Sequence, residues 1–170
     1  LPRRDPSPQR LRGTDGMVSP DLDDVETSLG SVAERLAGTE FSFTRKNDCI
    51  EATCPWGNHI RVHAPAPEYG AMQIGMPYVE LNAPVGSAEA IARFYREIMG
   101  ANATVAHRNG APCASVVTGK AQFLHFIETE DEQPDYDGHH VAIYIADFVG
   151  PYDKLMQRGL ITMESDAHEW

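Results

Sequence analysis

Three stretches of the chain share one pattern of hydrophobic and polar positions. In residues 138–159, 76–100 and 17–38, a short extended segment passes through a bend into a segment whose apolar residues recur at helical spacing. Each of these helical segments ends at a glycine. A strand–helix unit that recurs at fairly even intervals indicates a fold assembled from repeated supersecondary units.

The pattern predicts three helices, each with one apolar side for packing. Ser87 is expected as the N-cap of the second helix, and Pro151 suits the first turn of the third. The apolar positions at helical spacing are Val25, Leu29, Val32 and Leu36 in the first, Ile91, Phe94, Tyr95, Ile98 and Met99 in the second, and Tyr152, Leu155 and Met156 in the third.

The other apolar segments predict strands separated by turns. A hairpin is expected over residues 41–53 with its turn at 45–48, followed by a second turn at 54–58 and a strand at 59–63. A further strand, 78–83, precedes the second helix, and three short strands fit between residues 103 and 128. Residues 1–16 are rich in Pro, Arg and Gly without an apolar period, so they are predicted to be an arm or linker.

Successive side chains of a strand point to opposite faces, so the predicted strands each place polar residues on one side. Residues that share a face within one strand are His59, Arg61 and His63; Tyr78, Glu80 and Asn82; Phe123, His125 and Ile127; and His140, Ala142 and Tyr144. Because a buried carboxylate needs a partner, Glu80 is expected to face either Arg61 or a metal ion. A histidine on a sheet face is either a hydrogen-bonded structural residue or a ligand.

Composition excludes several classes of protein. A chain of 170 residues with 42% hydrophobic content can form one domain or two small packed modules. No apolar run approaches the length of a membrane span, so a soluble protein without a membrane partner is expected. A formal net charge of −11 disfavours nucleic-acid binding. Three cysteines form no disulfide framework and favour a reducing, cytoplasmic location.

Three segments resemble the vicinal oxygen chelate superfamily, which includes glyoxalase I, extradiol dioxygenases and bleomycin-resistance proteins. They are the strand–helix segments YVELNAPVGSAEAIARFYREIMG and HVAIYIADFVGPYDKLMQRG, and the turn and strand CPWGNHIRV, which in the family usually reads D-P-x-G-N. The resemblance implies an α+β fold of paired βαβββ modules whose curved mixed sheets enclose a cavity. Residues 17–66 then correspond to the C-terminal part of a first module, and 72–170 to a second module lacking its closing strands.

The resemblance also implies a divalent metal on the concave sheet face, with Zn, Ni, Mn or Fe as the candidates. His140 stands at the family's histidine position, and His125 falls where glyoxalase I has a carboxylate, so these two are the expected ligands. Glu80 is the candidate catalytic residue, and Tyr78, Arg61 and Tyr144 are expected to line the ligand cavity. Arg61 occupies the position of the closing glutamate, and a permanent cation cannot ligate metal.

Two functions remain open at this stage, and with them whether the protein is an enzyme. The first is a metal-dependent lyase, isomerase or dioxygenase acting on a small molecule with vicinal oxygens, because His125, His140 and Glu80 are expected on one face. The second is a metal-free module of the bleomycin-resistance type that binds or sequesters a small aromatic or cationic ligand, because Arg61 replaces the glutamate. Homodimer formation is also left open.

Overall fold

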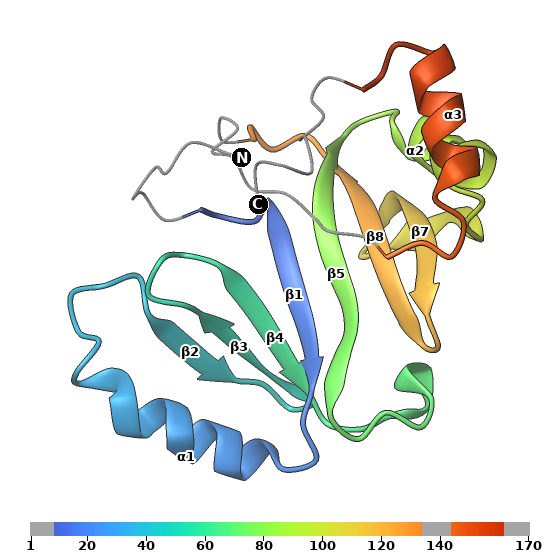
Figure 1. The fold of residues 1–170 in the computed structure, drawn as a ribbon. Coiled ribbons are helices and arrows are strands. Elements are labelled where there is room, and N and C mark those ends of the chain that lie inside the picture. The colour runs from blue at the N-terminus through green and yellow to red at the C-terminus, as the bar shows by residue number, and fades with distance from the viewer. Residues whose placement is uncertain (1–8, 134–143, 162–170) are drawn as a thin grey trace, which may run out of the picture.

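The computed structural model describes residues 9–133 and 144–161, which form an α+β fold around one mixed sheet of eight strands (Figure 1). The strand order across the sheet is β2-β3-β4-β1-β5-β8-β7-β6, and the sheet is open at both ends. Each half consists of one strand, one helix and three further strands, in that order along the chain. The predicted fold class, an α+β fold of paired βαβββ modules, is confirmed.

The helices and strands agree with most of the predicted segments, including the hairpin before residue 53 and the strand at 59–63. The first module contains β1 (Gly13–Val18), α1 (Leu22–Ala33), β2 (Ser42–Arg45), β3 (Cys49–Thr53) and β4 (His59–His63). A short 3-10 helix, η1 (Pro67–Tyr69), precedes the second module. That module contains β5 (Gly75–Pro84), α2 (Ala88–Glu97), β6 (Ala103–Arg108), β7 (Ala111–Gly119) and β8 (Gln122–Thr129), and α3 (Val149–Gln157) follows it.

The two modules meet through their first strands. β1 and β5 run antiparallel, with Thr14 opposite Glu80 and Gly16 opposite Tyr78. Within each module the first strand pairs in parallel with the last, β1 with β4 and β5 with β8. The four central strands are therefore β4, β1, β5 and β8, so side chains from both modules lie together in the middle of the sheet.

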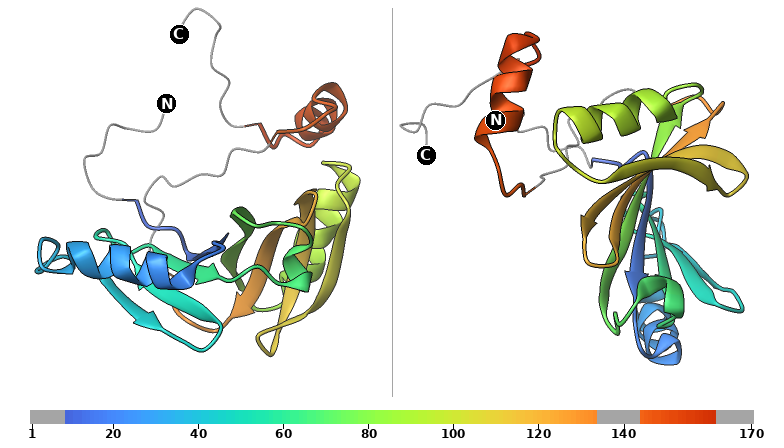
Figure 2. Two further views of the ribbon diagram at one scale, coloured as in Figure 1. Left: turned by 90° about the horizontal axis from the view of Figure 1, so that it is seen from below. Right: turned by 90° about the vertical axis from the view of Figure 1, so that its right-hand side faces the viewer.

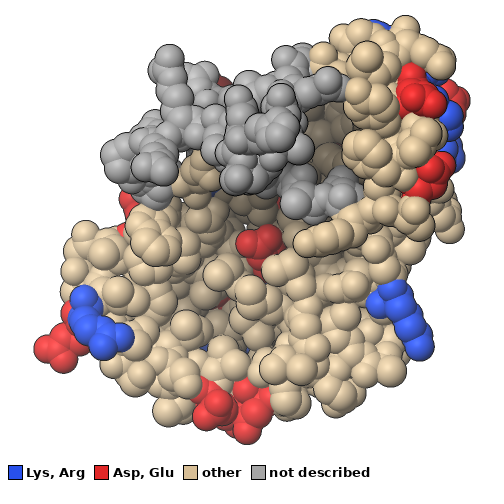
Figure 3. Space-filling model, in the orientation of Figure 1, with Lys and Arg blue, Asp and Glu red and all other residues tan. Residues whose placement is uncertain are grey.

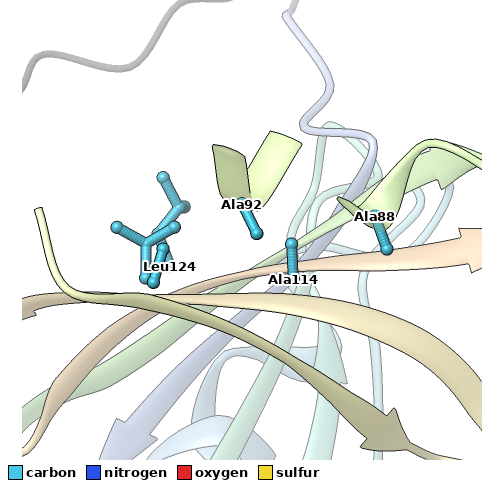
Figure 4. Close-up of a cluster of buried hydrophobic side chains, with 6 residues drawn as sticks. Ala88, Ala92, Ala114 and Leu124 are labelled. Carbon is cyan, nitrogen blue, oxygen red and sulfur yellow. The ribbon is translucent and has the colours of Figure 1, made fainter. Parts of the chain in front are cut away.

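Apolar packing against α1 and α2 covers one face of the sheet. In the first module Leu22 of α1 packs with Ile50 and Val62. In the second module Ala92 and Ala114 are fully buried, so α2 lies close to the strands (Figure 4). These residues alternate along the strands with polar residues of the opposite face, which we call the cleft face.

The N-terminal ends of the two helices are capped differently. Asp21 caps α1, where its Oδ1 accepts the backbone N–H groups of Asp23 and Asp24. Ser87 stands at the N-cap position of α2, as predicted, but its side chain forms no cap bond. Instead Glu128, from the end of β8, accepts the backbone N–H of Ala88 at 2.8 Å. Hydrogen bonds from the backbone of Gly86 and Ala88 lower the pKa of Glu128, and they join the last strand of the module to its helix.

The first strand begins earlier than the sequence pattern indicates. β1 begins at Gly13, inside the segment predicted as an arm, whereas the three strands expected between residues 103 and 128 are present as β6, β7 and β8. β1 shows little apolar alternation because it is a close-packed central strand. A side chain at Gly13 would overlap the Glu80 backbone, and one at Gly16 would overlap the Tyr78 ring. The predicted strand at 138–145 lies largely outside the described residues.

Charged side chains are distributed unevenly over the surface. On the face seen in Figure 3, most of the visible charged side chains lie near the margins, with an acidic group near the centre. Among the described residues, no helix has the length and apolar character needed to cross a membrane.

Candidate functional site

A cleft of about 1050 Å³ lies on the cleft face, where the central strands of both modules meet the turns at one end of the sheet. β4, β5 and β8 supply its floor, and the β2–β3 turn, η1 and the β6–β7 turn form its rim. The lining residues that the following paragraphs use are Lys46, Glu51, Arg61, His63, Tyr69, Tyr78, Arg108, Phe123 and His125. The strand residues among them all point to the cleft face, away from the core that packs against the helices.

An ion cluster occupies the floor of the cleft. Glu80 is buried, and its Oε1 accepts a hydrogen bond from Arg108 Nε at 2.6 Å. Its other oxygen lies 3.9 Å from Nη1 of Arg61. Nε of the same arginine lies 3.6 Å from Oε1 of Glu51. Both carboxylate oxygens of Glu80 thus face guanidinium groups. The predicted partner Arg61 is present, and the structure adds Arg108 as the closer one.

Tyr78 lies beside this cluster with its ring buried. Its hydroxyl is 2.7 Å from Nε2 of His63, and the guanidinium carbon of Arg108 lies 4.8 Å from its ring centroid. Burial, followed by the charge of Glu80, raises the pKa of Tyr78. Burial also lowers the pKa of His63, with Arg61 acting in the same direction. Tyr78 therefore keeps its proton, and a neutral His63 can accept the hydrogen bond that the Tyr78 hydroxyl donates.

His125 forms the opposite side of the floor. Its Nδ1 lies 2.9 Å from Oγ of Ser115, and its ring stacks on Phe123 at 5.5 Å with an interplanar angle of 9°. Burial, assisted by the charge of Arg108 and opposed by Glu80, lowers the pKa of His125 to about 4. The imidazole is therefore neutral at pH 7, so one ring nitrogen is an acceptor and the other a donor.

The rim adds a further aromatic ring and charged side chains. The Tyr69 ring lies 5.1 Å from that of His63, and burial is the main cause that raises the pKa of Tyr69 to about 12. Lys46 lies 3.6 Å from Glu51 across the β2–β3 hairpin. Cations and carboxylates are thus interspersed around the opening, and the acidic surplus of the whole chain is not concentrated there.

The structure brings most of the predicted site residues together. Arg61, Tyr78, Glu80 and His125 all lie in or below the cleft. Tyr144 does not lie among them: its side chain is fully exposed, and its role in the cavity wall stays a prediction. In the described part of the chain it precedes a bend and not a strand, and so the alternation expected there does not position it. His140 lies outside the described residues.

Sequence reasoning missed two residues that help to form the cleft. Arg108 and Tyr69 were not singled out, and His63 and Phe123 were noted only for their orientation in the strands. Arg108 directly precedes the Asn109–Gly110 turn, which marks the end of a strand but not its proximity to β5. The contact between Arg108 and Glu80 follows from the order of the strands in the sheet, which the sequence pattern does not give.

The described residues do not fit the metal site that the resemblance implies. Among them no group of three His, Cys, Asp or Glu side chains could hold an ion. On the central strands, Gly16 of β1 has no side chain, Arg61 of β4 is a cation, and Nε2 of His63 lies at 2.7 Å from the Tyr78 hydroxyl, which leaves Glu80 and His125 as donors on β5 and β8. Both oxygens of Glu80 already face guanidinium groups. We therefore derive no chemical step through a metal.

Two βαβββ modules joined through their first strands form the arrangement that the resemblance to the vicinal oxygen chelate superfamily implies, so the predicted fold is confirmed. No protein-family model and no curated protein matches the sequence. Solved structures do align with it. Glyoxalase I from Zea mays aligns with 15% identity and a TM-score of 0.48, over 67% of this chain and 41% of that one.

Two further solved structures align at similar levels. A glyoxalase/bleomycin resistance protein/dioxygenase superfamily member from Vibrio splendidus 12B01 is 11% identical, with a TM-score of 0.45 over 70% of this chain and 99% of that one. A catechol 2,3-dioxygenase is 13% identical, with a TM-score of 0.45 over 70% and 39%. The chain spans about two fifths of the maize glyoxalase I chain. At such identities the chemistry has to be argued from the residues themselves.

Proposed function

We propose that the protein is a metal-free small-molecule-binding protein whose ligand occupies the cleft. One observation carries this proposal: the Arg61–Glu80–Arg108 cluster stands where the resemblance implies a metal ion. Glu80 offsets part of the charge of the two guanidinium groups, and these are permanent cations that cannot act as metal ligands.

The size and lining of the cleft support binding of a compact organic molecule. Its volume, about 1050 Å³, is slightly above the range typical of small-molecule sites. Tyr69 and Phe123 offer ring surfaces, and the guanidinium groups of Arg61 and Arg108 offer hydrogen-bond donors. A floor rich in donors complements a ligand with acceptor oxygens.

A combined metal analysis and ligand screen tests the proposal. The full chain is purified without chelator or affinity metal, and its metal content is measured by elemental analysis beside His125→Ala and His140→Ala. We expect far less than one ion per chain in all three. In a thermal-shift screen of aromatic and oxygen-rich compounds, we expect hits whose stabilisation is lost in Phe123→Ala. A screen without such hits would refute the proposal.

A metal-dependent enzyme is the second candidate, and one observation favours it. Glu80 and His125 are register partners on β5 and β8, so both face the same region of the cleft face. With His140 they are the three residues expected on the concave face, His125 and His140 as ligands and Glu80 as the catalytic residue. Near-stoichiometric metal that is lost in both histidine variants would establish this candidate. Cytoplasmic location and homodimer formation also stay predictions.

A further inference from the structure

We propose that Arg108 anchors the ligand of the cleft and that this ligand is an aromatic carboxylate, held by its two carboxylate oxygens. This inference rests on the proposed function, because it specifies which small molecule the cleft selects. The guanidinium of Arg108 would hold the two oxygens of the ligand's carboxylate.

Arg108 is held in place while part of its guanidinium is left available. Its Nε donates to Glu80 at 2.6 Å, and its guanidinium carbon lies 4.8 Å from the centroid of the Tyr78 ring. Between them, these contacts fix the position and the orientation of the planar group. Within the described parts of the chain, its terminal Nη nitrogens make no hydrogen bond, and the side chain is 34% exposed. A carboxylate can therefore bind in the two-bond geometry that guanidinium groups favour.

Arg61 is less suited to the same task. It interacts with Glu51, Glu80 and the hydroxyl of Tyr78, so its donors are directed at the protein. It still adds positive charge beside the bound carboxylate. Arg108 is therefore the residue on which selectivity should depend, with Arg61 in support.

The aromatic part of the ligand is inferred from the walls next to Arg108. Phe123 lines the cleft and is backed on one side by the parallel ring of His125, which holds it in a fixed plane. Tyr69 lines the cleft from the rim, where the ring of His63 packs against it. A planar ring can stack on such walls while its carboxylate reaches Arg108.

Benzoate, benzamide and benzamidine provide a matched test, because they share a ring and differ in charge. Their dissociation constants are measured by NMR titration of the full chain. We expect benzoate to bind at least tenfold more tightly than benzamide, about 1.4 kcal/mol, and benzamidine to bind most weakly. Cyclohexanecarboxylate, an anion without an aromatic ring, should bind more weakly than benzoate.

Variants of Arg108 test its role directly. In Arg108→Gln the advantage of benzoate over benzamide should disappear, while benzamide affinity stays within about twofold. Arg93→Gln removes the same charge from the exposed side of α2 and should leave both affinities unchanged. Because Arg108→Gln leaves Glu80 with one partner, the double variant Glu80→Gln/Arg108→Gln provides a second protein without that imbalance. It should show the same loss of preference.

Three outcomes would overturn the inference: equal or tighter binding of benzamide, a benzoate preference that persists in both Arg108 variants, or no binding of any probe. In the first case binding in the cleft would still uphold the proposed function, since only the selectivity would be wrong. A compound screen without any hit that depends on Phe123 would instead remove the proposed function itself.

Discussion

Arg108 and Glu80 form a hydrogen bond although three strand spacings separate β6 from β5 in the sheet. On a flat sheet these two strands would stand about 14 Å apart. The 2.6 Å contact therefore requires the second half of the sheet to curve toward the cleft face. The bond fixes that curvature next to the ligand site.

Removing the charge of Glu80 should lower the stability of the fold. Glu80→Gln leaves Arg61 and Arg108 without their shared carboxylate, and we expect a loss of about 1–3 kcal/mol in the free energy of unfolding. Urea denaturation measures it. The matched control is Glu89→Gln on α2, which breaks the exposed pair with Arg96 and should cost less than about 1 kcal/mol. Equal losses in the two variants would contradict a buried ion cluster.

Stability should fall as the solution becomes acidic, through His125. Its pKa is about 4 in the folded protein against 6.5 as the reference value, so the unfolded chain binds the proton more tightly. Stability is then fully present above about pH 6.5 and lost as the pH falls toward 4, by about 2–3 kcal/mol. Urea denaturation at several pH values should show a smaller decrease for His125→Gln than for the wild type. NMR titration of the imidazole gives the pKa itself, and a value near 6.5 would refute the assignment.

A side chain at Gly16 should disturb the floor of the cleft. In Gly16→Ala the new methyl group overlaps the Tyr78 ring, so we expect a loss of about 1–3 kcal/mol. The second substitution Tyr78→Val should recover part of it, which a double-mutant cycle would detect as a favourable coupling. Gly30 lies in α1, where a new methyl group would make only an ordinary van der Waals contact with the Phe43 ring, so Gly30→Ala should instead be neutral or stabilising. Additive effects of the first pair would show that Gly16 and Tyr78 do not share this space.

The turn between β3 and β4 should tolerate aspartate in place of its cysteine. Sγ of Cys54 accepts the backbone N–H of Asn58 at 3.3 Å, the task of a turn-capping acceptor. Cys54→Asp should retain stability, whereas Cys54→Ala should lose about 0.5–1.5 kcal/mol. Thermal and urea denaturation of the two variants provide the comparison. Equal stability of the alanine and aspartate variants would show that the acceptor is dispensable.

The sequence predicts the elements of this fold better than their limits. Ile60 and Val62 alternate with polar residues, so β4 was predicted with the bounds that the structure shows. β1 was missed because Gly13 and Gly16, which close packing against β5 requires, leave no apolar signal. The need for glycine at these positions comes from the neighbouring strand.

The candidate site was predictable only within single strands. Alternation gave the orientation of Arg61, Tyr78, Glu80 and His125 within their own strands, the resemblance implied a shared cavity, and the structure brings the four residues together. The contacts of Arg108 depend on strand order and on curvature of the sheet, neither of which is encoded near residue 108. Tyr144 has no strand assignment in the described part of the chain, so strand alternation does not position it.

The parallel pairing of first and last strands has a consequence for how the molecule folds. β6, β7 and β8 can form from neighbouring segments of chain, whereas β5 pairs with β8 only across the intervening helix and strands. The same holds for β1 and β4. Since contacts between distant segments form slowly, we expect the first strands of the two modules, β1 and β5, to be placed last. The region that becomes the binding cleft would then be the final part of the sheet to assemble, and the slowest step in folding would also complete the site.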